Sequence, residues 1–276
     1  MKSYFSGFLA QSQVQTNISR KHIMKVAVIV HTHHKLNSLL VLLEGIYKQK
    51  LYKTEIHIYI VGNTWEFLNQ AHLQKFDFAH IQVLQTGKYL GNSGCFYYGL
   101  RFVSKLRYDY IWLLNDDVRL DPLALNTLIT TLQENDEVGL VSSQVYQIQE
   151  PKTIEEFGRL INNYKPESKI KFGNQKNVVS EGILKSKPYI QVDSCGNKSL
   201  LLRHKIVNHV GVLKDYFLHS GDIDLCLRVK KAGWIIAVNP SSIIWYDCPD
   251  CELWHLINYD YECNFYYWQK YRPDFL

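Results

Sequence analysis

The sequence predicts an α/β protein with a mixed, mainly parallel sheet flanked by helices. Short continuous apolar runs, typical of strands buried on both faces, alternate with segments of helical periodicity. This strand–helix alternation through the first half of the chain is typical of doubly wound sheets. Hydrophobic residues make up 46% of the 276 residues, which is enough for a sizeable core.

The first half of the chain supplies four predicted strands. The apolar run Val26–Val30 predicts the first, and Leu39 to Ile46 follow it with helical spacing. The stretches EIHIYIVGN, HIQVLQT and YDYIWLLNDD predict the other three, with a helix in GNSGCFYYGLRFVSKL before the last. In such sheets ligands bind beyond the carboxyl ends of the strands, so we expect the functional site at that edge.

The second half of the chain has weaker signals. We expect a helix over Leu123–Gln133 and an irregular, lysine-rich excursion over residues 151–187. IQVDSCGNKSLLLRHKIVNHVG predicts a strand and a helix, and IIAVNPSSIIWYD predicts two short strands. HSGDIDLCLRVKKAGW predicts a helix with Ser220 as its N-cap and Lys230 and Lys231 in its last turn. A Tyr-rich helix is expected at the C-terminal end.

Composition limits the classes of partner. The net charge of +5 fits an anionic ligand or an anionic membrane surface. We expect no nucleic acid partner, because no block of Lys and Arg is present. No run of about 18 apolar residues predicts a membrane span. Residues 1–23 are too polar for a signal peptide and are interpreted as an N-terminal extension of a cytoplasmic protein.

Six cysteines raise the question of a zinc site. Only Cys248 and Cys251 have the CxxC spacing of half such a site, and no second pair follows that spacing. Free thiols in a reducing compartment are the favoured interpretation.

Two adjacent carboxylates follow the fourth predicted strand. Asp116 and Asp117 end the stretch IWLLNDD. A strand end holds a carboxylate rigidly, and hard divalent cations bind carboxylates together with substrate phosphates and water. The pattern indicates a metal site, although Asn-Asp-Asp also favours a simple turn.

Glycines and a second acidic pair mark two further helix starts. Gly91 and Gly94 would let backbone N–H groups approach a phosphate, or would form a tight strand-to-helix connection. Asp222 follows Gly221, where a carboxylate can project into a cleft and act as a general base. Asp224 is interpreted as stabilising the helix dipole.

Histidines and aromatic residues are the remaining candidates. His31, His33 and His34 follow the first strand, and contact with a nucleotide is favoured over a metal trio. His219 is expected to border an acceptor near Asp222. The aromatic C-terminal segment is interpreted as a packed helix, with contact at a membrane interface as the alternative.

Together these segments resemble family 2 glycosyltransferases of the GT-A fold, and most closely bacterial rhamnosyl- and galactofuranosyltransferases. The likeness covers residues 25–272 and rests on VIVHTHHKLN, KYLGNSGCF, NDD after WLL, and GDIDLCLRVKKAGW, in that order. It implies a GT-A domain over residues 24–276. A nucleotide-sugar-binding half would span 24–121, and an acceptor-binding half with the C-terminal helix would span 122–276.

The resemblance also implies roles for single residues. Asp222 would be the catalytic base, Asp117 the ligand of Mg²⁺ or Mn²⁺, and Asp116 a nucleotide-sugar contact. The other donor-binding residues would be Thr32, His33, Asn63, Gly91 and Gly94, and the acceptor side would hold His219 and Trp245.

The chain departs from the family pattern at five places. Gly62, beside Asn63, replaces an acid that contacts the base, and Tyr89 replaces the asparagine of the glycine-rich segment. Asn115 replaces the first acid of the triplet, Gly221 the first acid of the pair, and Tyr246, beside Asp247, a histidine that binds metal in many members. A pseudoenzyme that binds nucleotide or glycan without turnover is therefore an alternative. A sugar-phosphate nucleotidylyltransferase is another, although HTHHKLN lacks the glycine-rich loop of that class.

The resemblance implies an inverting transferase that uses a nucleotide-diphosphate sugar, either dTDP-rhamnose or a UDP-sugar. The acceptor would be a glycan or a lipid-linked saccharide of bacterial surface polysaccharide synthesis. Contact with the inner face of the plasma membrane would be peripheral, through the lysines of residues 151–187 and the aromatic C-terminal segment.

Overall fold

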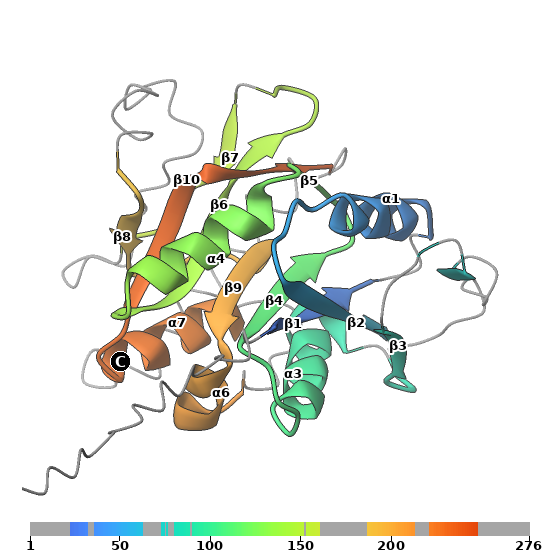
Figure 1. Cartoon of the computed structure of the whole chain (residues 1–276), viewed down its shortest axis with the longest axis horizontal. Coiled ribbons are helices and arrows are strands. Elements are labelled where there is room, and N and C mark those ends of the chain that lie inside the picture. The colour runs from blue at the N-terminus through green and yellow to red at the C-terminus, as the bar shows by residue number, and fades with distance from the viewer. Residues whose placement is uncertain are drawn as a thin grey trace, which may run out of the picture.

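The computed structural model describes residues 23–32, 36–62, 73–74, 76, 80–88, 90–151, 153–160, 187–212 and 221–247. These residues form one ten-stranded mixed sheet flanked by helices (Figure 1). The strand order is β3-β2-β1-β4-β9-β6-β10-β5, with β7 paired to β6 and β8 paired to β10. The predicted α/β class with a mixed sheet is confirmed.

The parallel part of the sheet comes from the first half of the chain. β1 (Met24–His31) lies between β2 (Thr54–Gly62) and β4 (Tyr110–Asn115), and β3 (His80–Gln85) pairs with β2. All three pairings are parallel, so the carboxyl ends of these strands meet at one edge. The four strands predicted from the apolar runs are present.

The second half of the sheet is dominated by antiparallel pairs. Its strands are β5 (Val118–Leu120), β6 (Val138–Gln147), β7 (Ile154–Glu156), β8 (Ile190–Val192), β9 (Ser199–Arg203) and β10 (Ile235–Tyr246). β9 inserts antiparallel between β4 and β6, and Ser199 pairs with Leu114 near the end of β4. The loop that enters β9 therefore lies at the carboxyl edge of the parallel strands.

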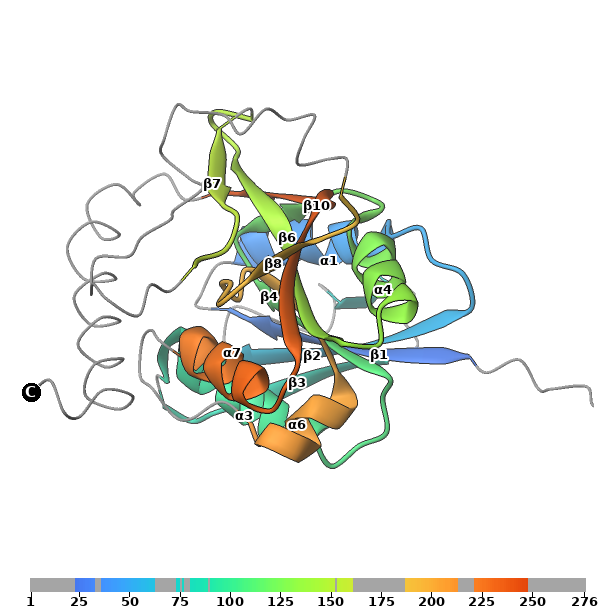
Figure 2. The same ribbon diagram turned by 90° about the vertical axis from the view of Figure 1, so that its left-hand side faces the viewer.

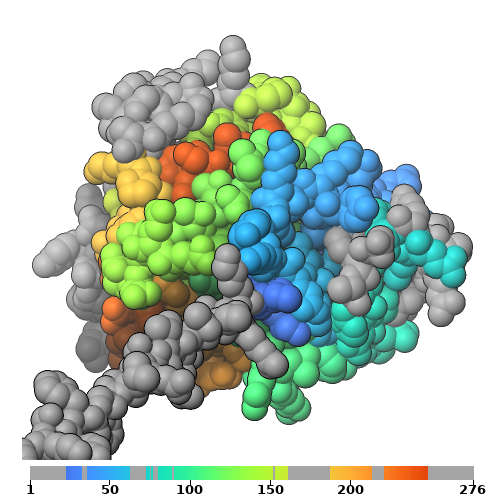
Figure 3. Space-filling view, in the orientation of Figure 1, coloured from blue at the N-terminus to red at the C-terminus, as the bar shows by residue number. Residues whose placement is uncertain are grey.

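Helices cover both faces of the sheet (Figure 2). α1 (Leu36–Tyr47) and α4 (Ala124–Glu134) share one core with the sheet and lie side by side on the face seen in Figure 3. α3 (Gly91–Val103), α6 (His204–Val210) and α7 (Gly221–Lys231) pack on the opposite face. Among the described helices, none is long and apolar enough to cross a membrane.

The central strands are apolar on both sides because both sides are covered. In β1, Val28 joins the core under α1 and α4, whereas its neighbour Ile29 joins the core under α3. Gly99 lets α3 approach β1 closely, since a Cβ there would lie 2.6 Å from Cγ2 of Ile29.

Two predictions about the second half need correction. IIAVNPSSIIWYD forms one strand, β10, because its pairing with β6 shifts register between Asn239 and Ile243 and so accommodates Pro240. Residues 151–187 are not irregular throughout, since Ile154–Glu156 forms β7 against β6. The predicted N-cap Ser220, the N-terminal extension before residue 23 and the aromatic C-terminal segment lie outside the described residues.

Candidate functional site

The ends of β1 and β4 are joined by a short hydrogen bond. Oγ1 of Thr32 donates to Oδ2 of Asp116 at 2.5 Å, and both side chains are buried. The backbone N–H of Asp116 donates to the carbonyl of His31 at 3.1 Å. The structure therefore brings together two of the predicted donor-binding residues and fixes Asp116 at the carboxyl edge.

The start of α3 lies beside the end of β4. Gly91 begins the helix with a φ of 66°, a conformation that favours glycine, and Gly94 is buried one turn later. Nδ2 of Asn92 donates to Oδ1 of Asn115 at 3.0 Å, and Nδ2 of Asn197 donates to Oδ1 of Asn92 at 2.8 Å. Asn115 is thus the end of a chain of neutral amides that links three segments.

Asp117 is held from the other side by β10. Its carbonyl accepts a hydrogen bond from the backbone N–H of Asp247 at 2.8 Å. The Asp247 carboxylate lies 3.3 Å from Arg119 and 3.4 Å from Nε2 of Gln149. Burial, with the negative charge of Asp117 and neighbouring acids, raises the pKa of Tyr246, so its phenol stays neutral.

These contacts define which metal site the residues fit. Among the described residues, no three His, Cys, Asp or Glu side chains gather as metal ligands. Neutral Tyr246 is a weak ligand for a hard cation, and Asp247 is engaged with Arg119 and Gln149. The half-buried Asp117 fits a site in which one protein carboxylate is completed by diphosphate oxygens and water.

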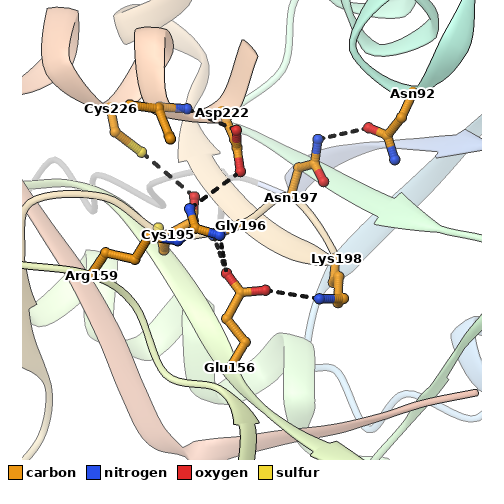
Figure 4. A network of polar contacts seen from close by, with 10 residues as sticks. Asn92, Glu156, Arg159, Cys195, Gly196, Asn197, Lys198, Asp222 and Cys226 are labelled. Carbon is orange, nitrogen blue, oxygen red and sulfur yellow. Dashed lines mark hydrogen bonds and ion pairs between the residues drawn. The ribbon is translucent and has the colours of Figure 1, made fainter. Parts of the chain in front are cut away.

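A buried charged network adjoins this edge (Figure 4). Glu156 accepts hydrogen bonds from Nζ of Lys198 at 3.0 Å and from the backbone N–H of Gly196 at 2.6 Å. Nη2 of Arg159 lies 3.6 Å from the same carboxylate. Burial alone would raise the pKa of Glu156, but the charges of Lys198 and Arg159 and the two hydrogen bonds lower it to about 2. Glu156 is therefore a poor proton acceptor.

Asp222 lies on the other side of Arg159, in the first turn of α7. Its side chain is buried, and Oδ2 lies 3.7 Å from Nη1 of Arg159. Oδ1 accepts a hydrogen bond from the N–H of Ile223 at 2.9 Å. Arg159 thus joins Asp222 to Glu156, and the helix start holds the Asp222 carboxylate beside the network.

Asp224, two residues later, has a different environment. It is fully buried, and its Oδ2 accepts a hydrogen bond from Nε of Arg228 at 2.9 Å. Arg228 in turn donates to the carbonyls of Val210, Gly211 and Val212, at and beyond the end of α6. Asp224 therefore links α7 to α6.

Three of the six cysteines are described, and all three are free thiols. Cys195 precedes Gly196, and Sγ of Cys226 donates to the Cys195 carbonyl at 3.8 Å. Burial raises the pKa of Cys195 well above its usual range and that of Cys95 to about 12. These thiols are packing groups at ordinary pH. The CPDC motif lies outside the described residues.

Several predicted site residues meet at one edge. Thr32, Gly91, Asp116 and Asp117 surround the end of β4, as the contacts above show. Trp245 alternates with Tyr246 along β10, so its side chain leaves the opposite face of the strand. His33, Asn63 and His219 lie outside the described residues.

Sequence reasoning missed four members of the network: Glu156, Arg159, Gly196 and Lys198. Glu156 and Arg159 lie in the segment that was interpreted as an irregular excursion. Gly196 and Lys198 lie in the short CGNK turn before β9. A glycine and a lysine directly before a buried apolar strand could have indicated a functional turn.

Comparison with known proteins adds the family. Residues 24–258 match the profile of the family described as "Glycosyltransferase like family 2". A search of curated proteins finds no match.

Three solved structures illustrate the likeness of the fold. A mannosyltransferase from Pyrobaculum calidifontis, solved with GDP-Man and Mn²⁺, is 13% identical with a TM-score of 0.57, over 84% of this chain and 59% of its own. GalNAc-T7, solved with UDP, GalNAc and Mn²⁺, is 9% identical with a TM-score of 0.63, over 82% and 44%. S. aureus TarS 1-349 is 12% identical with a TM-score of 0.55, over 81% and 60%.

Proposed function

Because the chain belongs to glycosyltransferase-like family 2, we propose that it is an inverting glycosyltransferase that uses a nucleotide-diphosphate sugar. The observation that carries the proposal is the convergence at one sheet edge of the Asp116–Asp117 strand end and the network that contains Asp222. The chain covers 44–60% of the lengths of the three solved structures. The substrates of those proteins are therefore not transferred to this chain as findings, and its donor and acceptor are given as proposals.

The donor binds at the edge formed by β1, β4 and the start of α3. Thr32 and Asp116 form a fixed polar pair there, and Asp116 contacts the sugar nucleotide. The helix start at Gly91 offers backbone N–H groups to a phosphate. His33 and Asn63 are assigned to the same donor site by their positions after the first two strands.

The transfer step is a single displacement. Asp222 takes the proton from an acceptor hydroxyl, and the hydroxyl oxygen attacks the anomeric carbon from the side opposite the diphosphate. The bond between the anomeric carbon and the diphosphate oxygen breaks, and the configuration inverts. Glu156 is unsuited to this role because its pKa is held at about 2. By the resemblance to the family, His219 and Trp245 are assigned to the acceptor side, although the Trp245 side chain leaves the face of β10 opposite to Tyr246.

Asp117 is the residue we assign to a divalent cation, Mg²⁺ or Mn²⁺. Two of the solved structures of the same fold contain Mn²⁺. The charges favour a cation, because Lys198 and Arg159 pair with Glu156 and Asp222, while Asp116 and Asp117 add two further negative charges near Tyr246. A bound cation would offset the charge on the departing diphosphate.

We assign the acceptor to glycans or lipid-linked saccharides of bacterial surface polysaccharide synthesis, with dTDP-rhamnose or a UDP-sugar as donor. The protein would act in the cytoplasm, with peripheral contact to the plasma membrane. Arg159, a cation of the same segment, pairs with Glu156 and Asp222 and so adds nothing to that contact. Co-sedimentation with anionic liposomes at low salt and release at high salt would support the contact, and no binding at low salt would exclude it.

Hydrolysis of nucleotide sugars tests the proposed function. The protein is incubated with UDP-, GDP- and dTDP-sugars, with Mn²⁺ or with a chelator, and free nucleoside diphosphate is measured. We expect slow release from one donor class and faster release with Mn²⁺. Binding without release from any donor would instead identify the pseudoenzyme that the substitutions at Asn115, Gly221 and Tyr246 suggest.

A further inference from the structure

Lys198 has an unusual position for a lysine. It ends the turn that enters β9, and its carbonyl lies 3.5 Å from the backbone N–H of Asn115, at the end of β4. Its side chain is only 13% exposed. The backbone of Lys198 thus lies directly beside the strand end that carries Asp116 and Asp117, and its side chain is largely buried.

The ammonium is fixed by two groups from different strands. Nζ of Lys198 donates to Oε2 of Glu156 at 3.0 Å and lies 4.5 Å from the centre of the Tyr246 ring. Tyr246 is followed by Asp247, whose N–H binds the carbonyl of Asp117. Lys198 and Asp117 are therefore neighbours of the same short stretch of β10.

The contacts of Lys198 leave it able to bind an anion. An ammonium has three N–H donors, and within the described ranges Glu156 is its one hydrogen-bond acceptor. The Tyr246 ring also holds the ammonium in place, through a cation–π contact rather than a hydrogen bond to an oxygen atom. At least one N–H donor therefore remains for a ligand.

We propose that Lys198 binds the diphosphate of the donor and neutralises part of its charge as it leaves. The inference rests on the proposed function and adds a residue to it. The chain has Asn115 where the family pattern has the first acid of the triplet, and Tyr246 where many members have a metal-binding histidine, which leaves Asp117 as the assigned metal ligand. Lys198 supplies at the same edge a positive charge that belongs to the protein.

Calorimetric titration with UDP, GDP and dTDP tests the proposal, with Mn²⁺ and with a chelator. Lys198→Met keeps the length of the side chain and removes its charge. We expect an affinity about 10- to 100-fold lower for the nucleotide that the wild type binds, as for the loss of a charge-assisted hydrogen bond. The loss should appear with Mn²⁺, and also with the chelator if wild-type binding is measurable there.

Lys205→Met is the matched control. Nζ of Lys205 lies 4.6 Å from the centre of the Trp234 ring, so this variant also loses a cation–π contact, but on α6. We expect wild-type affinity. An equal loss in the two variants would overturn the proposal, as would wild-type affinity in Lys198→Met.

A double variant distinguishes diphosphate binding by Lys198 from its neutralisation of Glu156. Lys198→Met alone leaves the buried Glu156 carboxylate without its ammonium, which adds negative charge and can destabilise the fold. Glu156→Gln combined with Lys198→Met removes both charges and keeps the net charge of the site. We expect affinity to stay low in the folded double variant, and recovery to wild-type affinity would show that Lys198 only neutralises Glu156. If the wild type binds none of the three diphosphates, the proposed function itself fails.

Discussion

The parallel and antiparallel halves of the sheet contribute differently to the same edge. In the parallel half, β3-β2-β1-β4, the polar contacts at the carboxyl edge are hydrogen bonds such as those between Thr32 and Asp116 and between Asn92 and Asn115. Beyond β4, the contacts are between charges, with Glu156, Lys198 and Arg159 brought in by β7 and the loop before β9. The parallel half forms a rigid edge, and the antiparallel half supplies its cations.

The two halves should respond differently to substitution. The parallel strands are held by apolar residues buried on both faces, so changes there act mainly on stability. The network beyond β4 depends on charges that balance one another, so changes there also act on ligand binding or on turnover.

The largest effect is expected at the start of α7. Asp222→Asn keeps the size of the side chain and removes the proposed proton acceptor. Transfer should fall by about 10²–10⁴-fold, because general-base catalysis contributes about that much. Binding of the nucleoside diphosphate should be unchanged, as measured by calorimetry beside the rate assay.

Asp224→Asn is the control for that prediction. Asp224 is fully buried and holds Arg228, so this variant should lower the melting temperature. It should keep a turnover close to wild type in the folded fraction. A near wild-type rate in Asp222→Asn would remove Asp222 from the mechanism.

The acid stability of the protein should depend on Glu156. Its pKa is lowered from 4.5 to about 2, so its contribution to stability is complete above about pH 4.5 and is lost as the pH falls through about 2. The shift corresponds to about 3 kcal/mol in the free energy of unfolding. Chemical denaturation of wild type and Glu156→Gln should show a stability difference near pH 6 that shrinks toward pH 2. A difference independent of pH would contradict the assigned pKa.

Substitution of Asp117 tests whether a divalent cation binds where the parallel and antiparallel halves of the sheet meet. Asp117→Ala should remove the part of diphosphate affinity that Mn²⁺ adds. We expect a loss of metal affinity of about 10- to 100-fold or more, since even residues that only orient a metal ligand contribute that much. Titration of UDP with and without Mn²⁺ measures it. An unchanged metal-dependent part would leave Asp117 as a turn residue.

The same comparison explains which features the sequence revealed. The strands of the parallel half were predictable because apolar runs such as Val26–Val30 have one favourable environment, a sheet covered on both faces. β7 was not, because Ile154–Glu156 has two glutamates and no apolar alternation. β10 was divided in the prediction because Pro240 usually ends a strand, and only the register shift against β6 accommodates it.

The site was predictable to the extent that it is local in the sequence. Asp116 and Asp117 follow directly on a buried strand, so the strand itself indicated them. Glu156 and Lys198 are 42 residues apart and form a pair only after β9 has inserted between β4 and β6. No spacing rule connects such residues, because the topology of the sheet decides their contact.

Two glycines offer the most direct test of the division between the halves, with the smallest expected effect. In Gly99→Ala the new Cβ would meet Cγ2 of Ile29 at 2.6 Å, between α3 and β1. In Gly196→Ala it would meet the carboxylate of Glu156, within the network. Overpacking of this kind costs about 1–3 kcal/mol, so both variants should have lower melting temperatures.

The two variants should differ in ligand binding. Folded Gly99→Ala should bind the nucleoside diphosphate as the wild type does, because Gly99 lies in α3, packed against Ile29 of β1 and away from the charged groups. In Gly196→Ala the new methyl group should displace the Glu156 carboxylate, which accepts hydrogen bonds from the Gly196 N–H at 2.6 Å and from Lys198 at 3.0 Å. Because the Lys198 ammonium is held by this carboxylate, its displacement should weaken diphosphate binding. Calorimetric titration below the melting temperature of each variant measures the difference. Equal affinities would mean that the charged network tolerates displacement, and the functional distinction between the two halves would fail at this position.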